Sequence, residues 1–392
     1  MRKVFTLFAF VYIHFIPLHG QSDTCKLQIS LLTCSPGQEL YSTFGHSALR
    51  VKDSSSGIDI IYNYGTFAFG PDFYPKFIKG NLLYFVSTQN FNDFVEDYKW
   101  QRRSIVEQLL LLNCTEKEGL FSALKTNALE QNKYYRYDFL YDNCSTRLRD
   151  IVAKNTLKPV TFKNILPENI PSFRNLIHVY LNKAGQYWSK LGIDLLLGSR
   201  LDQRVTSLQA MFLPDYLLKG FENATTKQLP LVIPAQTILA MPAAIQTTPL
   251  LQPMVVFSVL LTLILILSFT PSKKIQQGLK VFDICFFFIL GLVGLLLLFM
   301  WMGTDHAVCK DNFNLLWAIP THVVAAFLLY KNHGWMNYYM LATIILQAFL
   351  LIGWVFIPQE LNPGFLPIIL SILLRSWLII LKPHPTVHAK MD

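Results

Sequence analysis

Charged residues are scarce in this chain of 392 residues. Only 15% are Asp, Glu, Lys or Arg, whereas 52% are hydrophobic and the mean hydropathy is +0.34. The shortage is greatest in the C-terminal third, which excludes an ordinary soluble protein and indicates a membrane-embedded part. The net charge of +9 does not indicate a nucleic-acid partner, because no basic stripe interleaved with aromatic residues is present.

Several motifs of metal and nucleotide chemistry are also missing. The sequence has no CxxC pair, no HExxH and no acidic calcium loop, and His46 and His178 of the polar part are far apart. It has no GxSxG nucleophile elbow and no glycine-rich phosphate loop. We therefore expect no metal ion and no cofactor, which leaves cysteine chemistry.

Residues 1–20 have the layout of a secretory signal peptide. Arg2 and Lys3 precede an apolar run that ends at Ile16, and polar residues begin at Gln21. An uncleaved anchor is the alternative, and either segment would export the residues that follow.

Five apolar stretches near the C-terminus each approach the ~20 residues of a membrane-spanning helix. They cover residues 254–270, 281–303, 313–330, 338–357 and 366–381. Positive charge alternates between the connections, and the more positive ones carry Lys273, Lys274, Lys280, Lys331, Lys382 and Lys390. Because positive loops favour the cytoplasm, we expect the C-terminus inside and residues 21–253 outside. This predicts a multi-pass protein of a bacterial inner membrane.

The predicted domains follow from this topology. They are a signal peptide (1–20), an exported catalytic domain (21–228), a linker (229–253), a five-helix transmembrane domain (254–381) and a cytoplasmic tail (382–392). In the exported domain, short alternating segments over 27–85 and 104–111 favour strands. Helical spacing predicts a helix over 116–132, capped by Thr115, and another over 143–154. The exported domain is therefore α+β.

One hairpin can be placed in register. If 52–57 is its loop, Arg50 lies opposite Asp59 and His46 lies opposite Asn63. Asn63 would then fix the tautomer and orientation of the His46 ring. A slip by one residue would offer Tyr62 or Tyr64 instead.

Cys144 follows Asn143 at the start of the predicted 143–154 helix. Unpaired amide hydrogens and the helix dipole stabilise a thiolate there, and a nearby imidazolium lowers its pKa further. The same amides can stabilise an oxyanion. We therefore predict Cys144 as nucleophile and His46 as general base; a buried, inert cysteine is the alternative. The residues predicted to support this site or to bind substrate near it are Asn143, Arg50, Tyr64 and Arg147.

The exported part has four cysteines, namely Cys25, Cys34, Cys114 and Cys144. Disulfides form outside the cytoplasm, but a reactive Cys144 must stay out of them. We expect one bridge and one spare cysteine, with Cys25 joined to Cys34.

Other polar residues are candidates for lipid contacts. Arg102 and Arg103 could bind a phosphate headgroup or lie on a solvated surface. Arg375 lies in the middle of the last apolar stretch, where a charge is costly and has either a functional or a packing role. His306 and other polar residues of the outward loops line an outer-leaflet site or serve ordinary solvation. The segment 212–221 could dip into the membrane interface.

Two motifs, FGHSALR and YDFLYDNCSTR, with NYGTF between them, resemble the periplasmic domain of Lnb-type lipoprotein N-acyltransferases. The later TDH and PQELNP loops resemble the membrane domain of the same family. The order of histidine before cysteine is also similar to permuted papain-like folds of the NlpC/P60 type.

The resemblance implies acyl transfer from a membrane phospholipid, through a cysteine thioester, to the α-amino group of a diacylated lipoprotein. A papain-like amidase or peptidase, a phospholipase and a non-enzymatic membrane assembly factor are the alternatives. A peptidoglycan or protein hydrolase with the same Cys/His pair would not require a polytopic membrane domain.

Overall fold

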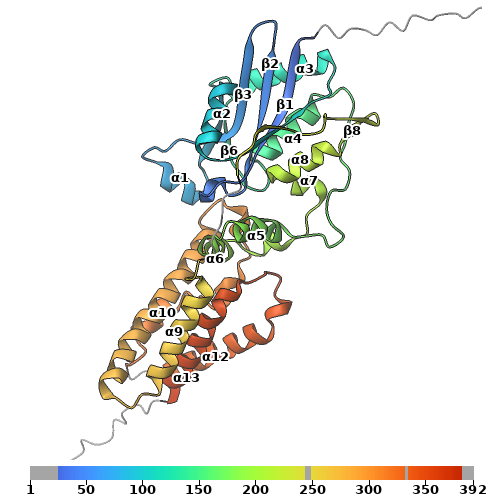
Figure 1. Cartoon of the computed structure of the whole chain (residues 1–392). Helices are drawn as coiled ribbons and strands as arrows, with labels where there is room; N and C mark the ends of the chain where they lie inside the picture. The colour runs from blue at the N-terminus through green and yellow to red at the C-terminus, as the bar shows by residue number, and fades with distance from the viewer. Residues whose placement is uncertain (1–24, 243–248, 332–333, 382–392) are drawn as a thin grey trace, which may run out of the picture.

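The computed structural model describes residues 25–242, 249–331 and 334–381. Figure 1 shows a domain of strands and helices above an elongated helical bundle. The prediction of an α+β domain followed by a helical membrane part is confirmed. The predicted signal peptide and cytoplasmic tail lie outside the described residues.

The upper domain is built on a seven-stranded sheet in the order β10-β5-β1-β2-β3-β4-β6. All neighbouring strands are antiparallel. The strands are β1 (Leu27–Cys34), β2 (His46–Asp53), β3 (Ile58–Thr66), β4 (Leu83–Asn90), β5 (Ile105–Leu109), β6 (Tyr134–Arg136) and β10 (Gln236–Leu239). The predicted strands over 27–85 and 104–111 are thus present, although helix α1 (Phe73–Lys79) interrupts the first region.

The sheet buries both faces because successive side chains of a strand point to opposite sides. On one face, Leu31 and Leu49 pack in a core with helices α3 (Cys114–Asn127), α4 (Cys144–Lys154) and α8 (Pro214–Glu222). On the other face, Leu32 and Ala48 pack against α2 (Phe91–Trp100). This double burial matches β1, in which Gln28 is the one exposed residue.

The predicted hairpin forms, but its register was wrong by two residues. Lys52, rather than Arg50, is paired with Asp59, and Asp53 with Ile58. The side chain of Asp53 accepts hydrogen bonds from the Ser55 amide (2.9 Å) and from the hydroxyls of Ser55 and Ser56. These bonds close a shorter turn than expected. Since the shift is even, each residue keeps its predicted face of the sheet.

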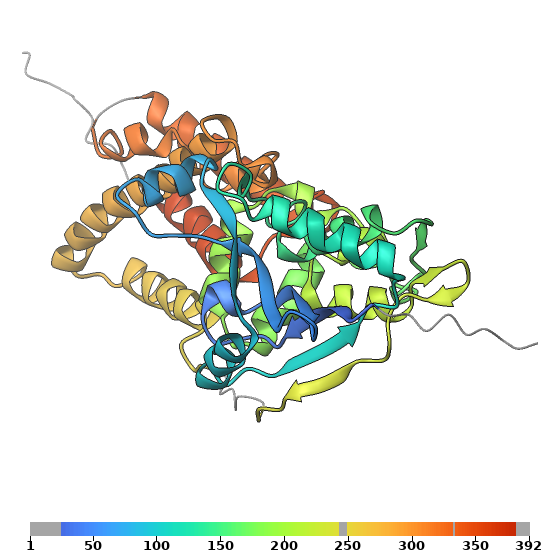
Figure 2. The same ribbon diagram turned by 90° about the horizontal axis from the view of Figure 1, so that it is seen from above.

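Two other local predictions need correction. Helix α3 is capped by Asn113, not Thr115, because Asn113 and Glu116 form a reciprocal capping box. The predicted linker is also shorter than 229–253, since β10 adds an edge strand beside β5. Figure 2 shows β10 running along this edge of the sheet. Leu239 packs against the core on the α2 side of the sheet. Burial of this apolar side chain favours the pairing of β10 with β5.

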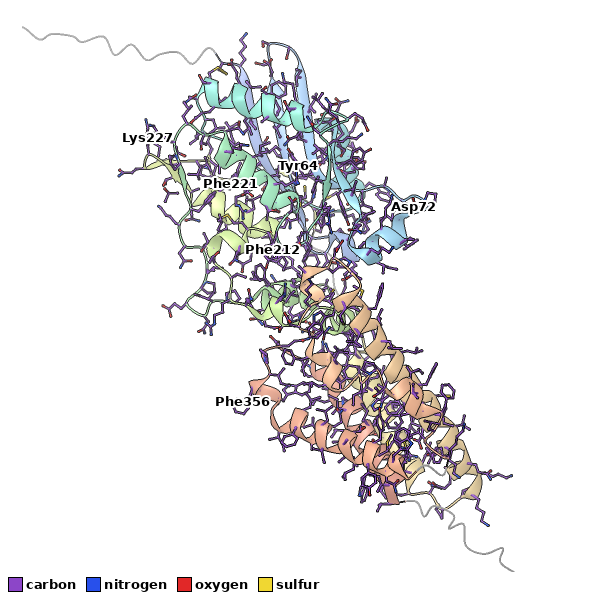
Figure 3. All side chains as sticks on the ribbon, turned by 180° about the vertical axis from the view of Figure 1, so that it is seen from behind. Tyr64, Asp72, Phe212, Phe221, Lys227 and Phe356 are labelled. Carbon is purple, nitrogen blue, oxygen red and sulfur yellow. A yellow bond between two sulfur atoms is a disulfide. The ribbon has the colours of Figure 1, made fainter. Side chains whose placement is uncertain are left out.

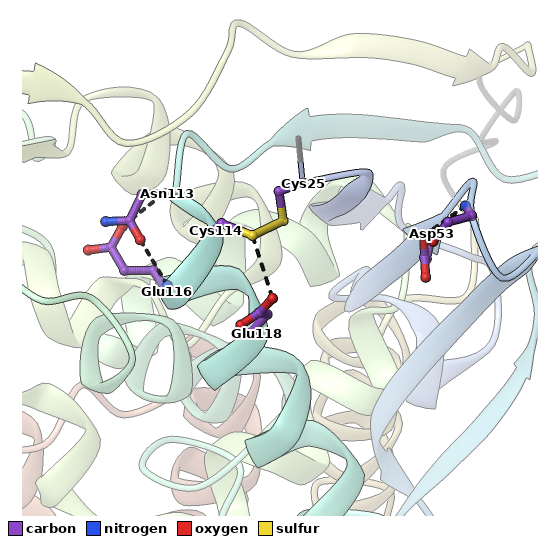
Figure 4. The surroundings of a disulfide bond; sticks show 7 residues. Cys25, Asp53, Asn113, Cys114, Glu116 and Glu118 are labelled. Atoms are coloured by element: carbon purple, nitrogen blue, oxygen red, sulfur yellow. Dashed lines mark hydrogen bonds between the residues drawn. A yellow bond between two sulfur atoms is a disulfide. The ribbon is translucent and has the colours of Figure 1, made fainter. Parts of the chain in front are cut away.

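The disulfide joins Cys25 to Cys114, with 5.6 Å between their Cα atoms (Figure 4). The predicted bridge between Cys25 and Cys34 is therefore wrong. Cys25 precedes β1 and Cys34 ends it, so the extended strand holds the two sulfurs far apart. Cys34 is instead fully buried as a free thiol.

A smaller group of elements lies between the sheet and the bundle. It contains α5 (Phe173–Lys183), α6 (Tyr187–Leu196) and the short α7 (Ser207–Ala210). Figure 1 shows α5 and α6 at the top of the bundle. A second, three-stranded sheet of β7 (Val160–Thr161), β8 (Thr225–Thr226) and β9 (Leu229–Pro230) lies at the side.

Three helical segments of the described chain are long and apolar enough to span a membrane. They are α10 (Lys273–Met302), α12 (Trp335–Ile352) and the segment Pro363–Leu381, which contains α13 (Leu366–Leu381). Helix α9 (Pro253–Ser268) is apolar but shorter. The first, second, fourth and fifth of the predicted spans are therefore helical.

The predicted span over 313–330 is not a continuous helix. It consists of the 3₁₀ helix η4 (Phe313–Leu316), a break at Pro320 and the short α11 (His322–Ala326). Proline removes a helical donor and disfavours helix in the residue before it. Gly291 and Gly294 of α10 admit the broken segment, since a Cβ atom at Gly294 would lie 2.3 Å from the Ala318 carbonyl oxygen.

Arg375 has a packing role in the bundle. Its guanidinium forms two hydrogen bonds with the Asp283 carboxylate (2.6 and 2.7 Å) and one with Ser268 (2.7 Å), and both charged side chains are buried. The hydroxyl of Tyr330 also donates to Asp283. This network joins α9, α10 and α13, so Arg375 lies in the bundle core and not beside Cys144.

Candidate active site

Helix α4 begins at Cys144 because Asn143 is its N-cap residue. The Asn143 side-chain oxygen accepts from the Thr146 amide (2.9 Å), and the Thr146 hydroxyl accepts from the Asn143 amide (2.8 Å). The Asn143 amide group also donates to the carbonyls of Phe139 and Phe212, both at 2.8 Å. Asn143 therefore fixes the helix start and is fully engaged in positioning Cys144.

His46 is the first residue of β2, and its side chain lies beside Cys144. The His46 Nε2 atom lies 3.2 Å from the Asn63 side-chain oxygen, and the imidazole interacts with the Cys144 sulfur. The structure thus brings together the three residues predicted as nucleophile, base and orienting amide. Asn63 lies diagonally across from His46, not directly opposite as predicted, yet within hydrogen-bonding distance.

The surroundings of Cys144 favour its thiolate. Burial raises the pKa of this thiol, but the charge and hydrogen bond of His46 lower it by more, with help from the Ser47 backbone amide and the Ser145 hydroxyl. The net pKa of Cys144 is lowered, and the residue is partly exposed. Cys34 contrasts with it, since burial raises its pKa to about 12.

Alkylation of Cys144 is expected to proceed at a lower pH than that of an ordinary thiol. In His46→Ala, burial still raises the pKa while the neighbouring cation is lost, so the alkylation profile moves to higher pH. Each unit of that shift lowers the thiolate fraction at neutral pH about tenfold. Iodoacetamide rates against pH measure the shift, with Cys144→Ala as background, and superimposable profiles would contradict the pairing.

A chain of hydrogen bonds continues behind Asn63. The Asn63 amide donates to the Gln89 side-chain oxygen (3.2 Å), and the Gln89 amide donates to Asp97 on α2 (3.1 Å). Both links hold the Asn63 oxygen toward His46. Gln89 is thus a positioning residue that sequence reasoning missed, because its contacts depend on the pairing of β3 with β4.

Replacing Gln89 with leucine should reduce turnover without unfolding the domain. The substitution keeps the volume but frees the Asn63 amide, and we expect a loss of about tenfold, the scale of an outer hydrogen bond at a catalytic site. The Cys144 alkylation profile should shift upward in the same variant. Gln89→Glu, which can still accept from Asn63, should retain more activity than Gln89→Leu.

Comparison with known protein families gives a match for each of the two parts of the chain. Residues 17–177, which contain His46, Asn63 and Cys144, match the Lnb N-terminal periplasmic domain, and residues 245–384 match the Lnb transmembrane domain. The chain is an Lnb-type protein. This membership indicates a periplasmic N-terminal region, a transmembrane domain and a role in lipoprotein processing at the membrane. No curated protein matches the chain. No solved structure matches it either.

The Lnb-type site contains further residues that the sequence did not single out. Gly65 adopts φ +85°, and a Cβ atom there would meet Cys144 Cβ at 3.7 Å and the Tyr137 ring at 3.5 Å. The Ser47 and Ser145 hydroxyls lie 3.2 Å apart beside the thiol. The NYGTF motif contained the signal for Gly65, because glycine is favoured at positive φ.

Three predicted supporting residues lie elsewhere in the Lnb-type fold. Arg50 pairs with Asp59 at 2.7 and 2.6 Å and with Glu107 at 3.2 Å, which occupies its guanidinium. Tyr64 is buried in the core, as Figure 3 shows, and its hydroxyl accepts from Asn127 (2.8 Å). Arg102 is exposed on a tight turn at φ 54° after α2. None of these placements makes the residue part of the Cys144 site.

Arg147 and the buried Arg103 brace the backbone. Arg147 binds both carboxylate oxygens of Asp142 (2.6 and 2.7 Å) and lies over the Tyr135 ring, so it fixes the loop before Cys144. Arg103 donates to the Ser35 carbonyl (2.7 Å) and is buried, which does not suit the predicted headgroup contact. Arg147 therefore braces the loop that leads to Cys144.

The polar loops of the membrane domain bind the periplasmic domain. Asp194 of α6 is buried and accepts from Arg174 (2.8 Å), His178 (2.8 Å) and Asn362 (2.7 Å). Its backbone carbonyl accepts from Asn314 (2.8 Å). Burial raises the pKa of Asp194, but these partners lower it by more. The loop polar residues thus form a junction between the two domains.

His306 lies in the same junction and contacts α1. Its Nε2 atom donates to the Phe77 carbonyl (2.9 Å), and it is not one of the groups acting on Cys144. The prediction that 212–221 dips into the membrane was wrong, because Phe212 and Phe221 are almost fully buried in the periplasmic domain (Figure 3). Their apolar character serves the core around α8.

Proposed function

We propose that this chain is a thiol-dependent lipoprotein N-acyltransferase of the inner membrane. Its acyl donor is a membrane phospholipid, and its acceptor is the α-amino group of a diacylglyceryl-cysteine lipoprotein. The observation that carries the proposal is the contact of His46 with a partly exposed Cys144 of lowered pKa, in a domain hydrogen-bonded to transmembrane loops. The Lnb family match supports the choice of substrates.

The first half-reaction forms a thioester. The Cys144 thiolate attacks the carbonyl carbon of the phospholipid ester, and first-turn amides of α4 stabilise the oxyanion. The carbon–oxygen ester bond then breaks, and His46 gives its proton to the departing oxygen of the lysophospholipid. Asn63 keeps the imidazole oriented through this proton transfer.

The second half-reaction transfers the acyl group to nitrogen. The lipoprotein amine attacks the thioester carbonyl, His46 accepts the proton from that nitrogen, and the carbon–sulfur bond breaks. The products are an amide and the regenerated Cys144 thiolate with a protonated His46. Exclusion of water by lipid and protein would protect the thioester from hydrolysis.

The arrangement of strand and helix supports a permuted papain-like fold. The histidine comes first in the chain, on strand β2, and the cysteine follows on the first turn of α4, which packs against that strand's sheet. The positive connections between apolar stretches support a periplasmic position for this domain and a cytoplasmic C-terminus.

Reconstitution of the full chain tests the proposal directly. The protein in phospholipid vesicles receives a synthetic diacylated lipopeptide, and mass spectrometry follows both substrates. We expect equal amounts of lysophospholipid and N-acylated peptide, with a hydroxylamine-labile acyl group on Cys144 when the acceptor is omitted. Lysophospholipid with free fatty acid would show a phospholipase instead, and unchanged phospholipid would overturn the proposal in favour of an amidase or an assembly factor.

A further inference from the structure

Helix α1 is an apolar element that contributes no buried residue to the core of the domain. None of its residues is buried, and the surrounding segment exposes Phe69 (74%), Tyr74 (67%), Phe77 (51%) and Ile78 (45%). Water-soluble domains rarely expose so many large apolar side chains together, and such a patch marks an interaction site. Lys76 and Lys79 of the same helix are basic.

The position of α1 is fixed by the loop that follows the spanning helix α10. The Asp305 amide donates to the Lys79 carbonyl (3.0 Å), and His306 donates to the Phe77 carbonyl. Arg136 joins the Gly80 carbonyl and the Asp305 carboxylate, both at 3.1 Å. Gly80 is at φ +74°, and a Cβ atom there would press on His306 at 3.3 Å. Helix α1 is therefore held at the end of α10.

The length of α10 indicates that this end lies near a membrane surface. The helix has 30 residues, which makes it about 45 Å long, against a hydrocarbon core of about 30 Å. Its last turns expose Phe299 (44%) and Met302 (81%) toward the surroundings of the bundle. Figure 1 shows α1 next to the upper end of the bundle, where α10 ends.

A row of aromatic rings connects α1 with the nucleophile. Phe73 lies 5.8 Å from Phe67, Phe67 lies 5.4 Å from Tyr84, and Tyr84 stacks on Tyr137 at 4.1 Å, measured between ring centroids. Tyr137 and Cys144 then flank Gly65. An acyl chain that lies along these rings would have apolar contact from the membrane surface to the thiol.

We propose that α1 and its flanking segment insert into the outer leaflet and admit the phospholipid acyl donor to the Cys144 site. Phe69, Tyr74, Phe77 and Ile78 enter the interfacial layer, and Lys76 and Lys79 face the phosphates. The aromatic row from Phe73 to Tyr137 guides the ester toward the thiol. The insertion stands on geometry alone, whereas the delivery of an acyl donor rests on the proposed function.

Photo-crosslinking tests the insertion without any need for activity. The full chain with Cys144→Ser carries p-benzoylphenylalanine in place of Phe77 and is placed in phosphatidylethanolamine nanodiscs. Leu229 is the matched control, because it is 69% exposed and lies near Lys227, on the side away from the bundle in Figure 3. We expect phospholipid adducts at 77 to exceed those at 229 by about tenfold or more, since only a bilayer residue meets lipid at high local concentration. Equal yields would overturn the proposal.

Donor competition tests the delivery step. In Phe77→Asp and Ile78→Asp, the ratio of kcat/KM for a bilayer donor to kcat/KM for a monomeric short-chain phospholipid should fall about tenfold, the scale of one lost buried apolar side chain. An unchanged ratio would mean that α1 has only a structural role. If the wild type transfers no acyl group at all, the proposed function fails while the crosslinking result still decides the insertion.

Discussion

Replacing Cys144 with alanine should abolish N-acylation of lipoproteins. The substitution removes the group that would form the thioester, and loss of a nucleophile of this kind costs about 10⁴-fold or more in rate. Mass spectrometry of a lipoprotein N-terminal peptide, from cells that depend on this chain, measures the result. We expect the peptide to remain diacylated with a free α-amino group.

The matched control for this experiment is Cys285→Ala. Cys285 is a free, exposed cysteine of α10 in the membrane domain, so its loss removes a thiol without touching the site. Cys285→Ala should leave the acylation pattern as in the wild type. Acylation that persists in Cys144→Ala would remove the thioester mechanism, whatever the family of the chain.

Replacing His46 with alanine should lower acyl transfer by about 10²- to 10⁴-fold, the usual contribution of a general acid–base group. The variant loses the base and also the cation that lowers the Cys144 pKa. Its residual activity should therefore increase with pH, because more thiolate forms only as the solution becomes more alkaline. The rate of the reconstituted reaction between pH 6 and 9 measures this effect.

Asn63→Ala provides the graded comparison. Asn63 orients His46 but carries no proton in the reaction, so its loss should cost less than that of His46, about 10- to 100-fold. An Asn63 variant that is as inactive as His46→Ala, with normal thermal stability, would show that Asn63 contacts the substrate itself.

The sequence predicted that Cys144, His46 and Asn63 lie together because local rules govern where these residues stand. An asparagine before a helical pattern predicts the start of α4, and alternation predicts the strand that carries His46. The hairpin register was wrong by two residues, yet Asn63 remained a correct neighbour of His46. An even shift preserves the face of each side chain, so facing direction is more robust than pairing.

The failures concern contacts between distant segments. The bridge from Cys25 to Cys114 depends on where α3 packs against β1, which no spacing reveals. Pro320 was visible, but its break is stable only because Gly291 and Gly294 let protein surround the irregular backbone. Likewise, Arg375 could be recognised as costly in a membrane, whereas its partner Asp283 could be found only from the fold.

The junction at Asp194 fixes the position of the periplasmic domain relative to the transmembrane domain. Hydrogen bonds from Arg174 and His178 on one side, and from Asn314 and Asn362 on the other, hold the two domains at a set separation. If Cys144 takes a phospholipid ester as proposed, this fixed separation would restrict the reaction to esters at one depth of the lipid. We expect acyl-position selectivity to change when Asp194 is replaced, because the separation between the two domains would then change.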